Sequence, residues 1–111
     1  MKINKKKFIY LISPNNIYTQ FYKDLSKVLS TDKVSFFQLR LKKYSLRSKI
    51  LIGKKVKRIC KKYRVKFLVN DDPFLAKKLN ADGCHLGQKD TSIIETKKLI
   101  GNKIIGITCH N

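Results

Sequence analysis

Short apolar runs alternate along the whole chain with segments whose apolar residues recur at helical spacing. The runs are rich in aromatic and β-branched residues and predict strands at residues 8–13, 34–41, 67–69, 84–86 and 104–108. Helical stripes separate them, and in the first of these Ile17, Phe21 and Leu25 share one face. No hairpin signal joins two strands directly, so each helix is expected to return the chain to the start of a parallel strand. The alternation therefore predicts an α/β fold of about five strands and four helices.

The helix boundaries have signals of their own. Asp72 can cap a helix whose first turn holds Pro73, where the missing N–H costs nothing. Ser92 and Glu95 have the spacing of a capping box, and Gly101 is placed as the glycine that ends that helix. Neither a linker nor a low-complexity segment interrupts this order. The 111 residues are therefore expected to form one domain or part of one.

Periodicity alone fits two parallel architectures, an open doubly wound sheet and an incomplete (β/α)8 barrel. The glycine fingerprint of a dinucleotide site is absent after the first predicted strand, where residues 13–16 read SPNN. The sequence also lacks a Walker phosphate loop. Both absences argue against a nucleotide-binding open sheet.

Basic residues far outnumber acidic ones. Lysine and arginine total 26 against 7 aspartate and glutamate, which gives a net charge of +19. Such an imbalance invites a polyanionic partner. Lysine, isoleucine and asparagine are over-represented together, however, and a drift in coding bias produces that pattern without selection for binding. A solvated basic surface is therefore the competing interpretation.

Cysteine usage and the amino terminus bear on the compartment. Cys60, Cys84 and Cys109 are an odd number without CxxC spacing, so we expect reduced thiols rather than a disulfide framework or a zinc finger. The basic start MKINKKK is followed by an apolar run over residues 8–12 only. That run is short for a signal peptide and far short of the ~20 residues that span a bilayer. We expect a soluble cytoplasmic protein without a membrane segment.

Polar residues follow the second predicted strand, and ligands of parallel α/β sheets bind at the carboxyl ends of strands. A period of two puts Gln38, Arg40 and Lys42 on one face. Leu39 and Leu41 then lie on the other face, under the helices. The polar three would face the barrel interior or its mouth, where an arginine beside a lysine suits a phosphate or diphosphate. An edge strand with one solvated face is the alternative.

Acidic residues follow the next two predicted strands. Asn70 and Asp71 come after the third strand, and Asp90 comes after the fourth. Carboxylates from neighbouring strand ends can jointly hold a magnesium ion together with water and substrate phosphate oxygens. Alternatively, Asp71 and Asp90 only favour nearby helix N-termini electrostatically.

The remaining reactive residue types predict structural roles. His85 and His110 have no partner at metal-ligand spacing, so structural hydrogen bonding is expected for both. Cys84 and Cys109 are expected to be small buried hydrophobes. No sequence context resembles a Ser/His/Asp or Cys/His nucleophile arrangement.

Three segments, in this order and spacing, resemble the thiamine phosphate synthase family. They are FQLRLK, FLVNDDPFLAKKLNADGCHLGQKD and IIGITCHN, and the similarity runs over essentially the whole chain. The resemblance implies a (β/α)8 barrel and a magnesium-dependent transferase of thiamine biosynthesis. Such an enzyme condenses 4-amino-2-methyl-5-(diphosphooxymethyl)pyrimidine with thiazole phosphate, giving thiamine phosphate and pyrophosphate.

The resemblance also assigns roles to residues. It implies that Asp71 and Asp90 are the magnesium ligands and that Asn70 contacts the substrate. The pyrimidine diphosphate-binding stretch falls on residues 38–42, that is Gln38, Leu39, Arg40, Leu41 and Lys42, of which Arg40 and Lys42 are the expected catalytic cations. Thr108 stands where the family usually has serine, which keeps the hydroxyl and adds a methyl group. No protein nucleophile is needed, in agreement with the absence of a triad.

The length departs from the family's pattern. Five predicted strands stand where the barrel needs eight, so residues 1–111 are expected to be the N-terminal portion of a single barrel domain whose C-terminal portion is absent. The missing half would include the thiazole phosphate contacts. We expect this chain to be inactive and marginally stable alone unless a second chain completes the barrel.

Two other functions compete with the synthase. The segment between Asp32 and Asp71 contains no acid and many cations, which permits a basic RNA-binding module. No RNA-recognition motif or aromatic platform accompanies those cations, so a nucleic-acid partner is the weaker expectation. Thiazole tautomerase-like relatives share the barrel but handle no diphosphate, so the retention of Arg40, Lys42, Asp71 and Asp90 favours the synthase.

Overall fold

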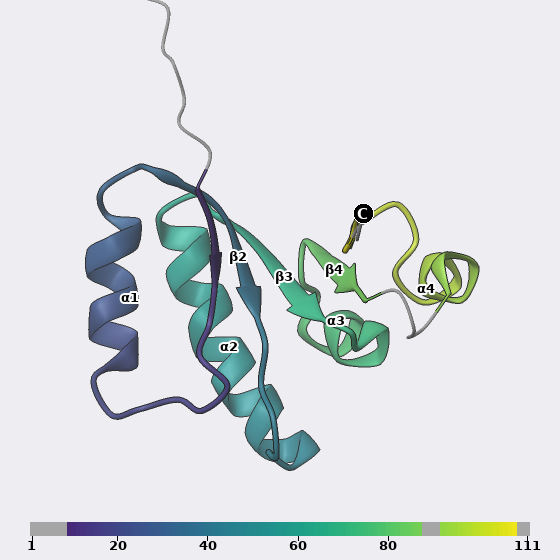
Figure 1. Ribbon diagram of the computed structural model, residues 1–111, viewed down its shortest axis with the longest axis horizontal. Helices are drawn as coiled ribbons and strands as arrows, with labels where there is room; N and C mark the ends of the chain where they lie inside the picture. Colours follow the sequence, from purple (N-terminus) through teal and green to yellow (C-terminus); the bar gives the residue numbers. More distant parts are fainter. Residues whose placement is uncertain (1–8, 88–91, 109–111) are drawn as a thin grey trace, which may run out of the picture.

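The computed structural model describes residues 9–87 and 92–108 and shows five parallel strands joined by helices (Figure 1). In chain order the elements are β1 (Ile9–Ile12), α1 (Phe21–Leu29), β2 (Val34–Leu39), α2 (Leu46–Lys62), β3 (Lys66–Asn70), α3 (Pro73–Leu79), β4 (Gly83–Leu86), α4 (Ile93–Ile100) and β5 (Ile104–Ile107). The strand order in the sheet is β1-β2-β3-β4-β5, so each strand pairs with the next one along the chain. This is the order in which an incomplete (β/α)8 barrel is built, and it confirms the predicted fold class.

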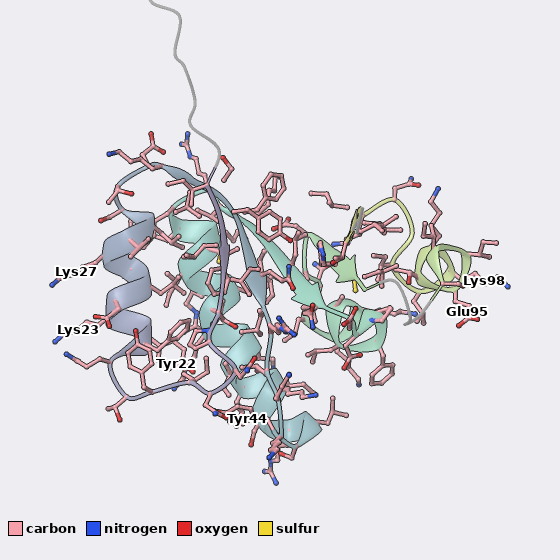
Figure 2. All side chains as sticks on the ribbon, in the orientation of Figure 1. Tyr22, Lys23, Lys27, Tyr44, Glu95 and Lys98 are labelled. Carbon is pink, nitrogen blue, oxygen red and sulfur yellow. The ribbon has the colours of Figure 1, made fainter. Side chains whose placement is uncertain are left out.

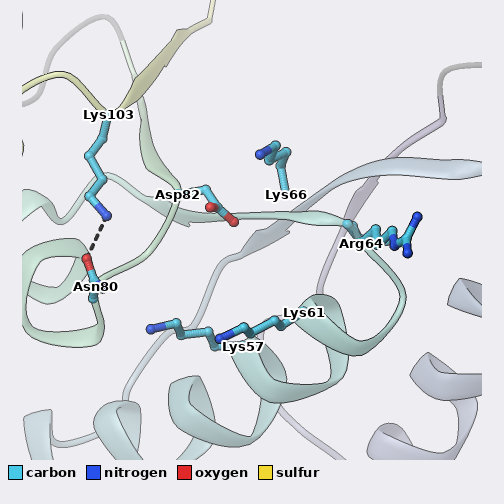
Figure 3. Close-up of a pocket in the computed structure, with 8 residues that line it drawn as sticks. Lys57, Lys61, Arg64, Lys66, Asn80, Asp82 and Lys103 are labelled. Atoms are coloured by element: carbon cyan, nitrogen blue, oxygen red, sulfur yellow. Dashed lines mark hydrogen bonds between the residues drawn. The ribbon is translucent and has the colours of Figure 1, made fainter.

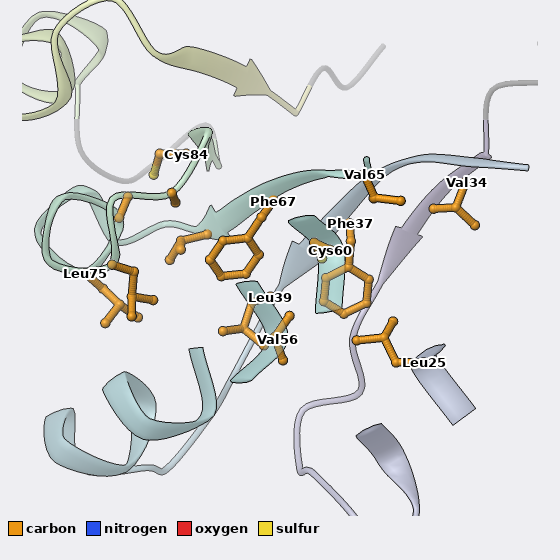
Figure 4. Close-up of a cluster of buried hydrophobic side chains, with 14 of the residues drawn as sticks. Leu25, Val34, Phe37, Leu39, Val56, Cys60, Val65, Phe67, Leu75 and Cys84 are labelled. Atoms are coloured by element: carbon orange, nitrogen blue, oxygen red, sulfur yellow. The ribbon is translucent and has the colours of Figure 1, made fainter. Parts of the chain in front are cut away.

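Alternate residues of the central strands divide the sheet into two faces. Phe37 and Leu39 of β2 and Phe67 and Val69 of β3 are almost fully buried and pack with residues of the helices in one apolar core (Figure 4). Each such side chain contributes about 1.5–3 kcal/mol on transfer from water. Gln38, between the two β2 residues, is buried on the opposite face of the sheet. The period of two therefore separates a helix-covered face from the face that carries the polar residues.

The predicted caps are confirmed. The Asp72 side chain accepts a hydrogen bond from Leu75 N at 2.9 Å at the start of α3, with Pro73 in its first turn. Ser92 Oγ accepts from Glu95 N at 3.1 Å at the start of α4, and Gly101 ends that helix with φ +67°.

The first predicted helix is too long. The apolar stripe includes Ile17, but α1 begins at Phe21. Ile17 lies in the preceding loop, where its N–H donates to Tyr44 Oη at 2.8 Å. The hydrogen bond ties the loop after β1 to the loop after β2, and a stripe of apolar residues does not reveal such a contact.

Both edge strands of the sheet expose apolar side chains. On β1, Ile9 and Ile12 are 42% and 49% exposed, and on β5 Ile104 and Ile107 are 37% and 46% exposed. A closed barrel has no edges, because its first and last strands pair with neighbours. The exposure at β1 and β5 is what an open portion of a barrel would show.

Candidate active site

The carboxyl ends of β1 to β5 bring most of the predicted site residues to one end of the sheet. Asn70 is in register with His85 across the pairing of β3 and β4. Thr108 follows β5, and its N–H donates to Leu86 O of β4 at 3.0 Å. Gln38 lies one residue before the end of β2. These side chains come from four neighbouring strands, so they share one rim of the curved sheet.

Asp71 joins the end of β3 to the end of β4. Its N–H donates to His85 O at 2.7 Å, and its Oδ1 accepts from Gly87 N at 2.5 Å. Asn70 Nδ2 donates to the other carboxylate oxygen, Oδ2, at 3.4 Å. The backbone of Asp71 is left-handed, with φ +52°, a conformation that aspartate tolerates better than most residues. These contacts hold the half-buried carboxylate beside the loop that leaves β4.

The segment over residues 38–42 differs from the expected strand. The prediction that the strand continues to Leu41 is wrong, because β2 ends at Leu39 and Arg40 and Lys42 lie in the loop after it. Their N–H groups leave the sheet ladder: Arg40 N donates to Ser13 Oγ at 2.8 Å, and Lys42 N to Asn15 O at 3.2 Å. The loop after β1 thus replaces the ladder as the partner of this segment.

The leucine side chains of this segment lie where they were expected. Leu39 is buried in the core, and Leu41 packs against it, so neither side chain faces the candidate site. Arg40 and Lys42 are exposed at the end of the sheet. The stretch expected to bind the pyrimidine diphosphate therefore offers two cations and the amide of Gln38, together with backbone groups.

A chain of hydrogen-bonded side chains crosses the polar face of the sheet. Gln38 Nε2 donates to Tyr10 Oη at 3.0 Å, Tyr10 Oη lies 3.3 Å from His85 Nδ1, and His85 Nε2 lies 2.7 Å from Thr108 Oγ1. Because Gln38 donates to the phenol oxygen, the phenol proton is available to His85 Nδ1. In the tautomer that accepts this proton at Nδ1, His85 Nε2–H donates to Thr108 Oγ1. Burial, opposed by the Gln38 hydrogen bond, raises the pKa of Tyr10 from its ordinary value of 10.0.

Three residues of this arrangement were missed as site residues by the sequence analysis. They are Tyr10, Ser13 and His85, of which only His85 was expected to make structural hydrogen bonds. Strand alternation counted from Ser13 does not predict that Tyr10 belongs to the site. Nothing in the local sequence indicates that β1 and β4 approach each other across the polar face. Ser13 ended a predicted strand and is in fact 6% exposed, with its hydroxyl also donating to Arg40 O at 3.3 Å.

The predicted magnesium ligands are only partly described. Asp90 lies outside the described residues, as do Cys109 and His110. Across residues 9–87 and 92–108, no group of three or more His, Cys, Asp or Glu side chains gathers at metal-ligand distances. Of the expected pair, Asp71 alone can therefore be placed.

The described cysteines are buried and poorly ionisable. Burial raises the pKa of the Cys60 thiol to about 12. Burial, with the nearby Asp71 and Asp72 carboxylates, raises the pKa of Cys84 to about 11, although a hydrogen bond to the backbone of Asp72 opposes the shift. Since the thiolate is the nucleophilic form, neither residue can act as a nucleophile at neutral pH.

Comparison with known proteins decides the family. The sequence profile described as thiamine monophosphate synthase matches residues 9–111. The chain belongs to the thiamine monophosphate synthase family. Thiamine-phosphate synthase of Pelagibacter ubique strain HTCC1062 is 66% identical over 100% of this chain and 55% of its own length. Thiamine-phosphate synthase of Bacillus cereus strain ATCC 10987 is 36% identical over 92% of this chain and 47% of its own length.

A solved structure of a family member has the same fold. The chain superimposes on thiamine phosphate pyrophosphorylase from Pyrococcus furiosus with a TM-score of 0.79 and 29% sequence identity, over 94% of this chain and 50% of the other. The chain therefore spans about half the length of the relatives that it matches. Among the helices in the described ranges, none is both long and apolar enough to cross a membrane.

Proposed function

We propose that this chain provides the pyrimidine diphosphate-binding half of a thiamine phosphate synthase. The observation that carries the proposal is the position of Asp71, whose carboxylate is bonded to Gly87 at the start of the loop that leads to Asp90. Three residues of chain reach at most about 11 Å, so Asp90 can approach Asp71 without any rearrangement of β3 or β4. Gln38, Asn70 and Thr108 stand on the same rim.

In the proposed reaction, the thiazole nitrogen replaces pyrophosphate on the pyrimidine CH2 carbon. The bond between the pyrimidine CH2 carbon and the diphosphate oxygen breaks, and its electron pair leaves with pyrophosphate. The thiazole nitrogen donates the electron pair that forms the new C–N bond. Negative charge therefore grows on the departing diphosphate, and cations at this rim stabilise the transition state more than the ground state. Arg40 and Lys42 would supply that charge, the arginine by a forked contact with phosphate oxygens.

Magnesium is the cofactor that suits this donor set. Asp71 offers carboxylate oxygens, the ligand type that magnesium prefers, and among residues 9–87 and 92–108 the contact recorded to Oδ2 is the long one from Asn70. Asp71 and Asp90 would hold the ion. When bound, the ion would neutralise charge on the diphosphate. Asn70 would orient the Asp71 carboxylate and contact the substrate.

The remaining strands of the barrel are part of the proposal. The apolar side chains exposed on β1 and β5 mark the two edges that further strands would cover. We propose that a second half, matching the part of the relatives that this chain does not span, pairs with both edges and supplies the thiazole phosphate contacts. The complete enzyme would act in the cytoplasm, where the thiols stay reduced.

Ligand binding by the chain tests the diphosphate site. The pyrimidine diphosphate is titrated into the 111-residue chain by calorimetry, with magnesium and with EDTA. We expect magnesium-dependent binding that Asp71→Asn and Asp90→Asn each weaken at least about tenfold, or about 1.4 kcal/mol. Asp24→Asn is the matched control, because Asp24 is exposed on α1. Equal affinity of all four proteins would refute the diphosphate site.

Turnover tests the complete proposal. The chain is mixed with the separately purified C-terminal half of the Pelagibacter ubique relative, and thiamine phosphate is measured after both precursors are added. We expect product from the mixture and none from either half alone. Product from the 111-residue chain alone would overturn the requirement for a second half. The RNA-binding alternative would be favoured if the chain bound RNA but no diphosphate, and if the Asp71 and Asp90 variants still bound RNA.

A further inference from the structure

A basic pocket lies at the end of the sheet opposite to the candidate active site. Its volume is about 430 Å3, and it lies at the amino ends of β3, β4 and β5 (Figure 3). Five cations line it: Lys57, Lys61, Arg64, Lys66 and Lys103. They come from α2, the loop after it, the start of β3 and the loop before β5, so separate parts of the chain converge there. From this convergence we infer a second anion-binding site, whose ligand is a compact chain of linked phosphate groups.

Little negative charge within the pocket opposes such a ligand. Among the described lining residues the single acid is Asp82, and its Oδ2 already accepts a hydrogen bond from Phe67 N at 2.8 Å. Asn80 Oδ1 accepts from Lys103 Nζ at 2.6 Å, which fixes that ammonium group at the side of the pocket (Figure 3). Lys57 and Lys61 extend along the opposite side, from α2. An anion between them would meet cations from both sides.

Helix electrostatics accounts for only part of this charge. Lysine in the last turn of a helix stabilises the carbonyl end of the helix, and Lys61 lies in the last turn of α2. Lys103, from the loop before β5, donates to Asn80, the residue that caps the end of α3, so it also stands near a helix terminus. Lys66 belongs to a strand and serves no helix terminus. Repulsion of Lys66 and Lys103 by the other cations costs stability unless an anion or counterions compensate it.

The pocket continues into a second basic depression. This neighbour, of about 420 Å3, shares Lys57, Lys61 and Asn80 with the first and adds Lys54, Arg58 and Lys78. The combined surface suits several linked phosphates rather than one isolated phosphate. No aromatic side chain stands among the described lining residues of either depression, so bases would have no stacking surface. The chemistry therefore favours inorganic polyphosphate or the phosphate chain of a small molecule over RNA.

The overall charge of the chain makes a matched control essential, since a net charge of +19 attracts any polyanion. Lys61→Glu/Lys103→Glu removes two pocket cations. Lys23→Glu/Lys27→Glu makes the same charge change on α1, where both side chains project from the exposed surface (Figure 2). Inorganic tripolyphosphate is titrated into the wild type and both variants at fixed salt, and backbone amide shifts are mapped by NMR in the wild type.

We expect tripolyphosphate to bind the wild type, with affinity lost at least about tenfold in the pocket variant and at most about twofold in the control. The largest amide shifts should fall at residues 61–66, 80–82 and 103. Equal losses in both variants, or wild-type shifts spread over α1 as well, would overturn the site. Tighter binding of oligouridine than of tripolyphosphate would assign the surface to RNA and overturn the proposed ligand. The wild-type shifts decide the matter even if a variant fails to fold.

Discussion

Tyr10 and His85 lie 75 residues apart in the sequence, yet the Tyr10 phenol oxygen is 3.3 Å from His85 Nδ1. Their rings meet edge to face with centroids 6.0 Å apart. Tyr10 is on β1 and His85 on β4, and β2 and β3 separate these strands in the sheet. Side chains so far apart in the strand order meet only because the sheet curves toward its polar face. The contact is therefore a consequence of the barrel curvature. It also links the hydrogen bond of Gln38 to that of Thr108 at the candidate active site.

Removal of the Tyr10 hydroxyl group should destabilise the chain. Gln38 is 3% exposed, and Tyr10→Phe takes away the acceptor of its Nε2–H and the partner of His85 Nδ1. A buried polar group left without a partner costs about 1–3 kcal/mol. We expect a loss in this range in the free energy of unfolding, measured by urea denaturation.

Tyr18→Phe provides the matched control for that measurement. The Tyr18 hydroxyl group donates to Asp24 at 2.8 Å on the exposed surface, where water can replace it. The same chemical change should therefore cost at most about 0.5 kcal/mol. Equal losses for the two variants would show that the hydrogen bonds of the Tyr10 hydroxyl, including the one from buried Gln38, contribute no more to stability than the one from Tyr18 to Asp24.

The close approach of β4 and β5 should make Gly83 intolerant of a side chain. A Cβ atom at Gly83 would overlap the backbone carbonyl of Ile104, its partner in the parallel pairing. Backbone cannot move aside without breaking the ladder, so we expect Gly83→Ala to lose at least about 3 kcal/mol in thermal or urea unfolding.

Gly53→Ala adds the same methyl group against a softer obstacle. The new Cβ would meet the end of the flexible Leu79 side chain, and alanine is favoured over glycine inside a helix by about 1 kcal/mol. We therefore expect a change within about 1 kcal/mol of neutral. Equal loss of stability in Gly53→Ala and Gly83→Ala would contradict this explanation. The contact with backbone rather than with a side chain would then not be the reason that Gly83 is required in β4.

Local features of the structure were predictable because their causes are local. Asp72 caps α3 and Ser92 caps α4 through hydrogen bonds that span three residues, and their spacing is visible in the sequence. Leu39 lies under the helices because alternation in a strand sets the face of each side chain. Leu41 packs against the same core from the loop that follows β2. The resemblance of three segments, in their order and spacing, supplied the family, which periodicity did not.

Nonlocal features were not predictable in the same way. β2 ends at Leu39 because Ser13, from the loop after β1, takes the N–H of Arg40 out of the ladder. The Tyr10–His85 contact depends on the curvature of the whole sheet. Both features depend on how the strands are arranged in three dimensions. The sequence pattern predicts only the order of the strands along the chain.

The uncovered edges should make the chain associate with itself. Ile12 on β1 and Ile107 on β5 are each nearly half exposed, on the two strands that have only one neighbouring strand among the described residues. A charge on an edge strand disfavours pairing with another chain. We expect the average mass measured by sedimentation to be lower for Ile12→Lys/Ile107→Lys than for the wild type, and closer to the monomer mass of 12.9 kDa.

Ile94 is the control position for association, because it is 71% exposed but lies on the helix α4 rather than on an edge strand. Ile94→Lys should leave the mass distribution unchanged. Addition of the C-terminal half of a relative should suppress association of the wild type as the edge variant does. A wild-type chain that stays monomeric at every concentration would contradict the role of the edges.

Burial of the Cys60 thiol should make stability depend on alkaline pH. The folded pKa of about 12 exceeds the unfolded value of 9.0, so the contribution is fully present below about pH 9 and is lost as pH rises toward 12. Each pH unit in that window costs up to about 1.4 kcal/mol. The free energy of unfolding in urea is measured for the wild type and Cys60→Ala at about pH 8 and about pH 10.5. Between these two pH values, the stability advantage of the wild type should shrink by up to about 2 kcal/mol. Titration of lysines, tyrosines and Cys84 affects both proteins and cancels in the difference. A difference independent of pH would show that the thiol ionises as readily in the folded chain as in the unfolded one.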